Sequence, residues 1–347
     1  MNQVKYIFSQ DIEFLNRSKF NRIVAKCNGD KYVKHYTCWN QLLTLIFGQL
    51  SGAATLRDVV IVFLAHNEKL YHLGIGIHLS RSNLSKANEQ RDYHIFEAFA
   101  YYMIGQARHK RTSKMFDFEG NVYAFDSTTI DLCLALFKCA TFRKKKDGIK
   151  VHSLFDVQAG VPIFAYITEA KVHDMNAMDE IPYETGSYYI FDRGYNDYTR
   201  LYVIHKLGAT FTGYYQQQDH PEPLRLIRYW DEENRREFIF LTNNFDLTSL
   251  EVAELYRNRW QIELFFKWLK QHLKIKHFYG TSLSAVKIQV YVAIIIFYLV
   301  AIVQYDMKLT LSTYEVLQVF SVSLTAKSTC VTCLTKLIFK MTKNTLI

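Results

Sequence analysis

The chain lacks an apolar run long enough to cross a lipid bilayer. Its most hydrophobic run, residues 288–303, contains Gln289 and, at about 16 residues, falls short of the roughly 20 that a membrane-spanning helix needs. The opening Met-Asn-Gln-Val-Lys-Tyr also lacks the apolar core of a secretory signal. We therefore expect no membrane partner and no secretion, and interpret the run as a buried helix.

Cysteine is sparse and scattered. Among the six cysteines, only Cys330 and Cys333 have the spacing of a zinc or redox pair, and no second pair accompanies them. Most of the six lie in apolar surroundings, which favours buried thiols of a reducing compartment over metal ligands. We expect a cytoplasmic protein.

Low-complexity tracts and internal repeats are also absent, and acidic residues are in deficit. The 347 residues are 49% hydrophobic and 15% aromatic, which indicates a folded protein of two or three domains. Lys and Arg number 42 against 33 Asp and Glu, a formal net charge of +9. This clustered excess favours nucleic acid as partner, although a basic protein can also lack an acidic partner.

The first part of the chain, residues 1–115, predicts a helical domain that binds DNA. Apolar residues recur there at helical spacing, and Ser80 is a candidate N-cap for a short polar helix carrying Arg81, Asn83 and Lys86. Such a helix has the chemistry to read a groove or hold phosphates, but it could equally be an ordinary solvated helix.

Beyond residue 116 the pattern becomes that of strands, and residues 116–305 predict an α/β domain. We expect five strands in one mixed sheet, the first three as a meander and the last two separated by a helix at 197–207. Residues 216–249 interrupt this order as a β-rich insertion. The five expected strands are 121–127, 150–157, 161–168, 188–192 and 209–215; those of the insertion are 224–230 and 237–242.

Two aspartates end apolar strands, Asp126 after Val-Tyr-Ala-Phe and Asp192 after Tyr-Tyr-Ile-Phe. With Glu263 from a nearby helix, they would supply three hard oxygen ligands for Mg²⁺ or Mn²⁺. Two such ions, about 4 Å apart, support in-line phosphoryl transfer on DNA. Taken singly, the three acids could instead be a strand-end cap, an ion pair with Arg193 and an i,i+4 partner of Lys267.

The segment after the insertion predicts one helix with a polar stripe. At about 100° per residue, Tyr256, Arg259, Glu263 and Lys270 fall within roughly 60° of one another. The adjoining face is apolar and would fix the helix against a core.

These residues carry a resemblance. Phe125-Asp126-Ser127-Thr128, Phe191-Asp192-Arg193-Gly194-Tyr195 and the spacing Tyr256-x2-Arg259-x3-Glu263-x6-Lys270 resemble the DDE transposases of bacterial insertion sequences, in the branch founded on insertion sequence four. The resemblance implies an RNase H-like core with a β-strand insertion before the glutamate.

By the same resemblance, Asp126, Asp192 and Glu263 are catalytic and bind two metal ions, while Tyr256, Arg259 and Lys270 hold phosphates of the transposon end. Family members cut and paste, often through a hairpin, and act as homodimers on paired ends. The partners would be double-stranded terminal inverted repeats and target DNA. The family's base-stacking tryptophan lies in the insertion, where Trp230 is available; we expect Trp260 to pack beside the stripe.

Further residues with DNA-binding potential are basic. They are Arg193, Lys267 and the loop residues Lys144, Lys145 and Lys146. His152 and the pair His173-Asp174 could support the site or be structural.

Residues 306–347 form a C-terminal tail that departs from the family. From Thr329 onward it resembles no helix end or acidic tail of these enzymes, and we interpret it as a frameshift near residue 328. An intact sibling copy with the same end would remove that hypothesis. The predicted function is cut-and-paste DNA transposition by a protein associated with the nucleoid; the alternatives are a metal-dependent DNA nuclease without strand transfer and an inactive DNA-binding remnant.

Overall fold

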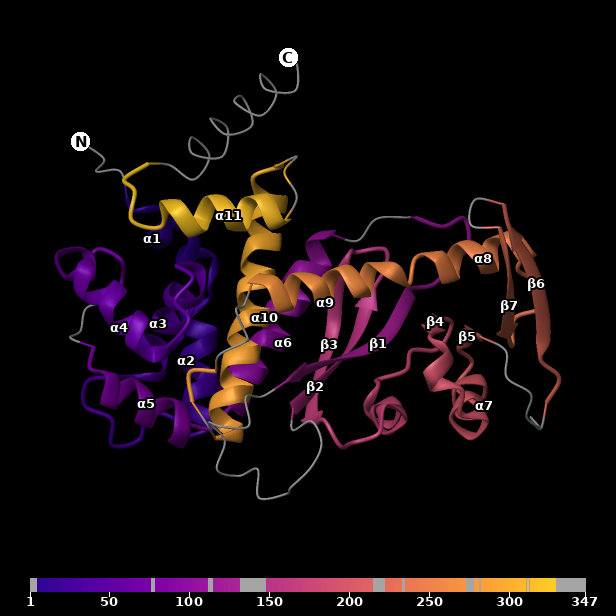
Figure 1. The fold of residues 1–347 in the computed structure, drawn as a ribbon, viewed down its shortest axis with the longest axis horizontal. Helices are drawn as coiled ribbons and strands as arrows, with labels where there is room; N and C mark the ends of the chain where they lie inside the picture. The colour runs from indigo at the N-terminus through magenta and orange to yellow at the C-terminus, as the bar shows by residue number, and fades with distance from the viewer. Residues whose placement is uncertain are drawn as a thin grey trace, which may run out of the picture. The chain divides into compact units, whose positions relative to one another are not determined.

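The chain forms two compact units in the computed structural model. The structure describes residues 5–75, 79–111, 115–131, 148–214, 222–232, 235–272, 278–280, 282–309, 311 and 313–328. The first unit comprises Met1–Lys110, Leu132–Lys144 and Trp268–Ile347; the second comprises Arg111–Asp131 and Lys145–Lys267 (Figure 1). The domain limits expected near residues 115 and 305 stay a prediction.

The first unit is helical. Its described elements are α1 (Ile7–Asp11), η1 (Ile12–Phe14), α2 (Arg17–Lys26), α3 (Cys38–Leu50), α4 (Leu56–Ala65), η2 (Asn67–Lys69), α5 (Arg81–Gln90), α6 (His94–Arg111), α10 (Leu283–Asp306) and α11 (Thr313–Ser323). The Ser80 hydroxyl accepts a hydrogen bond from the Asn83 N–H at 3.2 Å, so the N-cap predicted for α5 is confirmed.

Helix α10 is the core of this unit. It contacts α3, α5 and α11, and its residues from Ile288 to Val303 are all buried. By length and composition α10 could cross a membrane, but almost all of it lies inside the protein. The Gln289 side chain is buried and accepts a hydrogen bond from the Tyr279 N–H at 2.7 Å. A satisfied amide within the protein agrees with the predicted buried helix.

The second unit is built on a mixed sheet of seven strands in the order β3-β2-β1-β4-β5-β7-β6. Strands β1, β2 and β3 pair antiparallel as a meander, and β1, β4 and β5 pair in parallel. The strands are β1 (Val122–Asp131), β2 (Gly148–Asp156), β3 (Val161–Glu169), β4 (Tyr188–Phe191), β5 (Thr210–Tyr214), β6 (Arg225–Asp231) and β7 (Arg236–Thr242). The first five strands have the order and directions of an RNase H-like fold.

One expectation about the sheet needs correction. The two strands of the insertion were predicted outside a five-stranded sheet, but β7 pairs antiparallel with β5 and extends the sheet to seven strands. The physical reason is that an unpaired edge leaves N–H and C=O groups open, and a following hairpin can satisfy them. The insertion therefore shares the rigid backbone that carries the acids.

Helices and 3₁₀ turns connect the strands of the second unit. They are η3 (Asp174–Glu180), η4 (Arg193–Tyr195), α7 (Tyr198–Lys206), α8 (Ser249–Arg257) and α9 (Trp260–His272), of which α9 continues into the first unit. Helix α7 contacts β5, and α8 contacts β5 and β6. Helix α8 begins with a capping box in which Thr248 and Glu251 exchange side-chain hydrogen bonds with each other's backbone N–H.

Candidate active site

The two predicted aspartates come from neighbouring parallel strands. Phe125 of β1 is aligned with Phe191 of β4, so the next residue on each strand is an aspartate, Asp126 or Asp192. Strand β1 does not end at Asp126 as expected, because β2 pairs with it as far as Asp131. Asp126 is therefore held by ladder bonds on one side and lies where pairing with β4 stops on the other.

The predicted helix of the polar stripe is two helices. Helix α8 ends at Arg257 and α9 begins at Trp260, so the prediction of one continuous helix is wrong at Asn258 and Arg259. Asn258 explains the break, because its side-chain amide donates to the Glu254 carbonyl at 2.8 Å and accepts from Gln261 Nε2 at 2.9 Å. Asparagine side chains compete with helical backbone bonds in this way.

Arg259 links Asp126 and Glu263. Its Nη1 lies 3.3 Å from Asp126 Oδ2, and its Nη2 donates to Glu263 Oε1 at 2.7 Å. The Arg259 and Asp126 side chains are 16% and 19% exposed, whereas Glu263 is 54% exposed. The break between α8 and α9 thus directs a largely buried guanidinium to carboxylates that are far apart in the sequence.

Asp126 is strongly perturbed. Burial, together with the nearby Asp192 and Glu263 carboxylates, raises its pKa to about 6, although the Ser127 N–H and Arg259 oppose the shift. Both neighbouring acids therefore lie within electrostatic reach of Asp126. A carboxylate in such a setting has a strong preference for a cation beside it.

Tyr256 is directed to the second aspartate. Its hydroxyl donates to Asp192 Oδ1 at 3.4 Å, and the same oxygen accepts the Arg193 N–H at 2.7 Å. The Tyr256 ring packs against Phe240 of β7 at 4.9 Å, and burial raises the pKa of Tyr256 to about 12. The hydroxyl therefore stays protonated and can donate at neutral pH.

A second polar cluster lies beside Asp126. The Ser127 hydroxyl donates to Asp174 Oδ1 at 2.7 Å, and Lys150 Nζ lies 3.2 Å from the same oxygen. His152 is fully buried, with Nδ1 3.8 Å from Asp174 and Nε2 2.9 Å from Thr168 Oγ1. Two sequence candidates, His152 and Asp174, are thus close together and adjoin the residue after Asp126.

A cavity of about 450 Å³ opens beside Glu263. Its walls come from β6, β7 and the junction of α8 with α9, and they are aromatic and cationic: Tyr229, Asp231, Arg236, Phe238, Phe240, Ala253, Tyr256, Arg257, Arg259, Trp260 and Glu263. The contribution of β6 and β7 was not predicted. Alternation along β6 places Tyr229 and Asp231 on one face of the strand, but it does not indicate that this face borders Glu263.

Trp260 differs from expectation in its surroundings, and the role of Trp230 is not tested. Trp260 was expected to pack, but it is 50% exposed and lines the cavity. Trp230 is 53% exposed and alternates with Tyr229 along β6, so it belongs to the opposite face of the strand. A stacking role for Trp230 stays a prediction.

The other predicted basic residues are exposed or lie outside the described residues. Arg193 follows Asp192 and is exposed; Lys267 and Lys270 are exposed on α9. Lys144, Lys145 and Lys146, like Cys330, Cys333 and the tail from residue 329, fall outside the described residues.

The three carboxylates are the right donor type for a divalent metal ion, but their side chains do not gather around one point in this structure. Asp126, Asp192 and Glu263 are hard oxygen donors, as Mg²⁺ and Mn²⁺ prefer. In the described part of the chain, however, no three Asp, Glu, His or Cys side chains are gathered closely enough to hold one ion. Arg259 separates Asp126 from Glu263, so a shared ion requires the guanidinium to leave at least one of them.

An RNase H-like sheet with acids on adjacent strands and a third from a following helix is the architecture of polynucleotidyl transferases. A family described as "Transposase DDE domain" matches residues 117–299, and the chain belongs to this family. Its enzymes cleave and join DNA and use divalent metal ions. Residues 3–76 match a separate domain of unknown function.

Three curated relatives are named as transposases. The y4zB protein of Sinorhizobium fredii is 30% identical over 45% of this chain and 53% of its own length, so the chain spans about half of that relative. The protein for insertion sequence element IS5377 of Geobacillus stearothermophilus is 22% identical over 72% of this chain and 76% of its own length. The protein for insertion sequence element IS4SA of Synechocystis is 26% identical over 62% of this chain and 69% of its own length.

A solved structure also aligns. It is a piggyBac transposase synaptic complex with hairpin DNA, with a TM-score of 0.49 and 11% identity over 97% of this chain and 82% of that one.

Proposed function

We propose that the chain cleaves DNA at the ends of its own element and joins them to target DNA. The observation that carries the proposal is the Arg259 bridge between Asp126 and Glu263, with Asp192 on the adjacent parallel strand. Three acids from two strands and a helix, neighbours of one guanidinium in a DDE transposase, suit phosphoryl transfer better than they suit stability alone.

We propose Asp126, Asp192 and Glu263 as the ligands of two Mg²⁺ or Mn²⁺ ions. Bound divalent ions would activate a water or a 3′-hydroxyl and stabilise the leaving 3′ oxygen. Tyr256 orients Asp192 by its hydrogen bond, and Arg259 balances the acids until DNA and metal arrive. Released from a carboxylate, the Arg259 fork can grip a phosphate in two-pronged fashion.

DNA contacts are proposed for the cationic residues around these acids. Tyr256, Arg259 and Lys270 would hold phosphates of the transposon end, and Arg193, Lys267 and Lys144–Lys146 would add to the path of the DNA. The partners would be double-stranded terminal repeats and target DNA, bound by a homodimer on paired ends.

The aromatic cavity suits one nucleotide of the bound end. A volume of about 450 Å³ lined by Tyr229, Phe238 and Trp260 offers faces on which a base can stack, and Arg236 supplies charge for its phosphate. Trp260→Ala should then reduce end cleavage more than Trp230→Ala does. Equal losses of cleavage in the two variants would contradict a special role for the cavity that Trp260 lines.

The proposed function is tested by strand transfer in solution. Pre-cleaved duplexes carrying the repeats that flank the gene are mixed with a target plasmid and Mg²⁺, and joined product is measured. Joined product supports transposition, cutting alone supports a nuclease, and binding without cutting supports an inactive remnant. EDTA should stop both reactions.

The matched variants are Glu263→Gln and Glu254→Gln. Glu263→Gln should abolish cleavage and joining while DNA binding stays within about threefold, because it removes a metal ligand and keeps the shape. Glu254 is an exposed acid on α8, and its variant should retain activity. Persistent cleavage by Glu263→Gln would show that the acids are wrongly assigned.

A further inference from the structure

A cleft of about 540 Å³ lies in the first unit, on residues that the proposed chemistry does not use. One wall is the segment that follows α2, with Lys31, Lys34 and His35. The other wall is α5, with Asn83 and Lys86 at helical i,i+3 spacing on one face. We call this hollow the N-terminal cleft.

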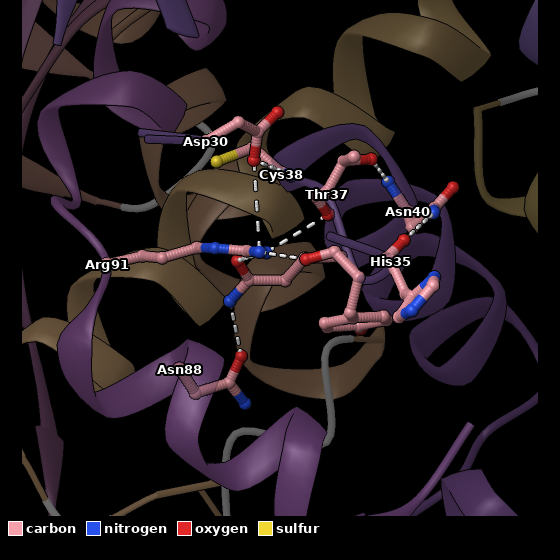
Figure 2. Close-up of polar contacts among 9 residues, drawn as sticks. Asp30, His35, Thr37, Cys38, Asn40, Asn88 and Arg91 are labelled. Atoms are coloured by element: carbon pink, nitrogen blue, oxygen red, sulfur yellow. Dashed lines mark hydrogen bonds and ion pairs between the residues drawn. The ribbon is translucent and has the colours of Figure 1, made fainter. Parts of the chain in front are cut away.

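Arg91 holds the segment after α2 in place by hydrogen bonds to its backbone carbonyls. The Arg91 side chain is 9% exposed. Its Nη1 donates to the Thr37 carbonyl at 3.0 Å and to Gln41 Oε1 at 2.9 Å, and its Nη2 donates to the Tyr36 carbonyl. Figure 2 shows Arg91 directed at Thr37, with Asp30 close by; Arg91 Nη2 lies 3.9 Å from Asp30 Oδ1. A largely buried guanidinium that donates to three acceptors holds the segment in one conformation.

The same network ties the segment to both neighbouring helices. Asp30 Oδ1 accepts the Cys38 N–H at 2.7 Å at the start of α3, and Gln41 Nε2 donates to Asn88 Oδ1 of α5 at 2.6 Å. Asn40 Nδ2 donates to the His35 carbonyl at 3.2 Å (Figure 2). The cleft is therefore preorganised, and groups on its rim need little reordering on binding.

The rim carries uncompensated positive charge. Lys31, Lys34 and Lys86 are exposed, and none forms an ion pair with any residue that the structure describes. The acid in the lining is Asp92, which is hydrogen-bonded to His94 at 2.6 Å. Three ammonium groups around one hollow create a field that attracts a polyanion.

An aromatic residue protrudes beside these lysines. Tyr32 is 91% exposed and has a φ of 62°, and Lys31 Nζ lies 5.3 Å from its ring. The left-handed region is costly for a bulky residue, and packing gives no compensation for so exposed a ring. Lys31 also lines a second hollow of about 560 Å³ with Arg17 and Trp39, so the segment stands between two cavities.

We propose that the N-terminal cleft binds the sugar-phosphate backbone of duplex DNA, as a site separate from the carboxylates. Lys31, Lys34 and Lys86 neutralise phosphates, Asn83 donates to a phosphate oxygen, and Tyr32 contacts the sugar edge of the duplex. This assignment rests on the proposed action on DNA, and it gives a role to the family-matched region of unknown function at residues 3–76 together with α5.

Salt-dependent binding tests the cleft. The full chain is titrated with a fluorescein-labelled, mixed-sequence duplex of about 20 base pairs, and anisotropy is read at several salt concentrations. Log K falls as log salt rises, and each phosphate contact contributes about 0.9 to the steepness of that fall. Replacing Lys31, Lys34 and Lys86 together by Gln should therefore make the slope less steep by about 3. Affinity at low salt should fall at least tenfold.

The matched control removes equal charge elsewhere in the same unit. Lys5→Gln, Lys308→Gln and Lys327→Gln combined should change the slope by less than 1, because these exposed lysines do not line the cleft. If the two triple variants behave alike, the cleft assignment is overturned.

Photo-cross-linking gives a readout that does not depend on charge. The photoreactive residue p-benzoylphenylalanine in place of Tyr32 should cross-link to the duplex, whereas the same residue in place of Tyr71 should not. Tyr71 is 79% exposed in the same unit and serves as the matched position. Equal yields at both positions would refute the contact.

The outcomes separate this inference from the proposed function. If wild-type protein joins DNA but the cleft variant binds like its control, the cleft assignment fails and the function stands. If binding requires the cleft but no metal supports cutting, the function fails and the cleft stands. A chain that does not bind the duplex at all refutes both.

Discussion

Arg259 shows how one residue can couple a sequence motif to a three-dimensional site. The motif reads as a stripe along a helix, yet Arg259 lies in the turn between α8 and α9, and its two nitrogens contact different acids. Its Nε is buried and has no hydrogen-bond partner among the described residues. Within the site, this guanidinium has capacity for a further acceptor, such as a phosphate oxygen.

Replacing Arg259 by Lys should lower DNA cleavage about 10- to 100-fold, because a single ammonium cannot span two carboxylates in the geometry of the planar fork. Duplex binding should stay within about threefold. The measurement is single-turnover cleavage, with Arg228→Lys on the exposed face of β6 as control. Full activity of the Arg259→Lys variant would exclude a need for the bidentate geometry.

His152 should make the second unit sensitive to acid. Burial lowers the pKa of His152 to about 4 from an ordinary 6.5; nearby Lys150 also lowers it, and Asp174 opposes the shift. The fold therefore favours the neutral ring. The contribution of His152 to the free energy of unfolding is fully present above pH 6.5 and is lost as the pH falls toward 4. The loss by pH 4.5 is about 2 to 3 kcal/mol.

The His152→Gln variant should lose less stability between pH 7.0 and 4.5, by about 2 kcal/mol, because it removes the titrating ring. Urea unfolding followed by fluorescence at both pH values measures the difference, and stability at pH 7.0 serves as the reference for each protein. An unchanged pH dependence would show that His152 does not control it.

At the level of secondary structure, the position of β1 depends on the turn at Gly120 that precedes it. Gly120 has a φ of 114°, and a Cβ there would lie 2.3 Å from the Gly186 carbonyl oxygen. Glycine is the residue that tolerates this conformation and this approach. The turn therefore sets the position of the strand that carries Asp126.

Gly120→Ala should destabilise the protein by about 2 to 3 kcal/mol, from backbone strain together with the clash. Gly160→Ala is the control: its φ is 66° and nothing lies within 4 Å, so it should cost about 1 kcal/mol. Chemical denaturation of both variants gives the comparison. Equal costs would mean that the close approach at Gly186 relaxes freely.

At the scale of the whole molecule, the net charge of +9 sets the energetics of binding. Duplex affinity should fall about a thousandfold between 50 and 200 mM salt, because released counterions drive the association. Anisotropy titrations measure it, and a peptide nucleic acid duplex of equal sequence is the uncharged control. A flat salt response would contradict phosphate contact as the main source of affinity.

Regular elements were predictable because their patterns are local. Alternation and turn residues predicted β1 to β5 within a few residues, and the expected meander of the first three strands is confirmed by the antiparallel pairing of β1 with β2 and of β2 with β3. The break at Asn258 was missed, because side-chain competition with the backbone leaves helical periodicity unchanged. The pairing of β7 with β5 was missed because periodicity carries no information about partners.

Residue types and their spacing were enough to predict the family, the order of strands and helices, and the acidic and basic residues of interest. The packing of distant segments was needed to show that one guanidinium separates Asp126 from Glu263, that β6 and β7 form walls of a cavity, and that Lys86 and Lys31 line one cleft. Such contacts depend on how distant segments pack, and local patterns do not encode the distance between them.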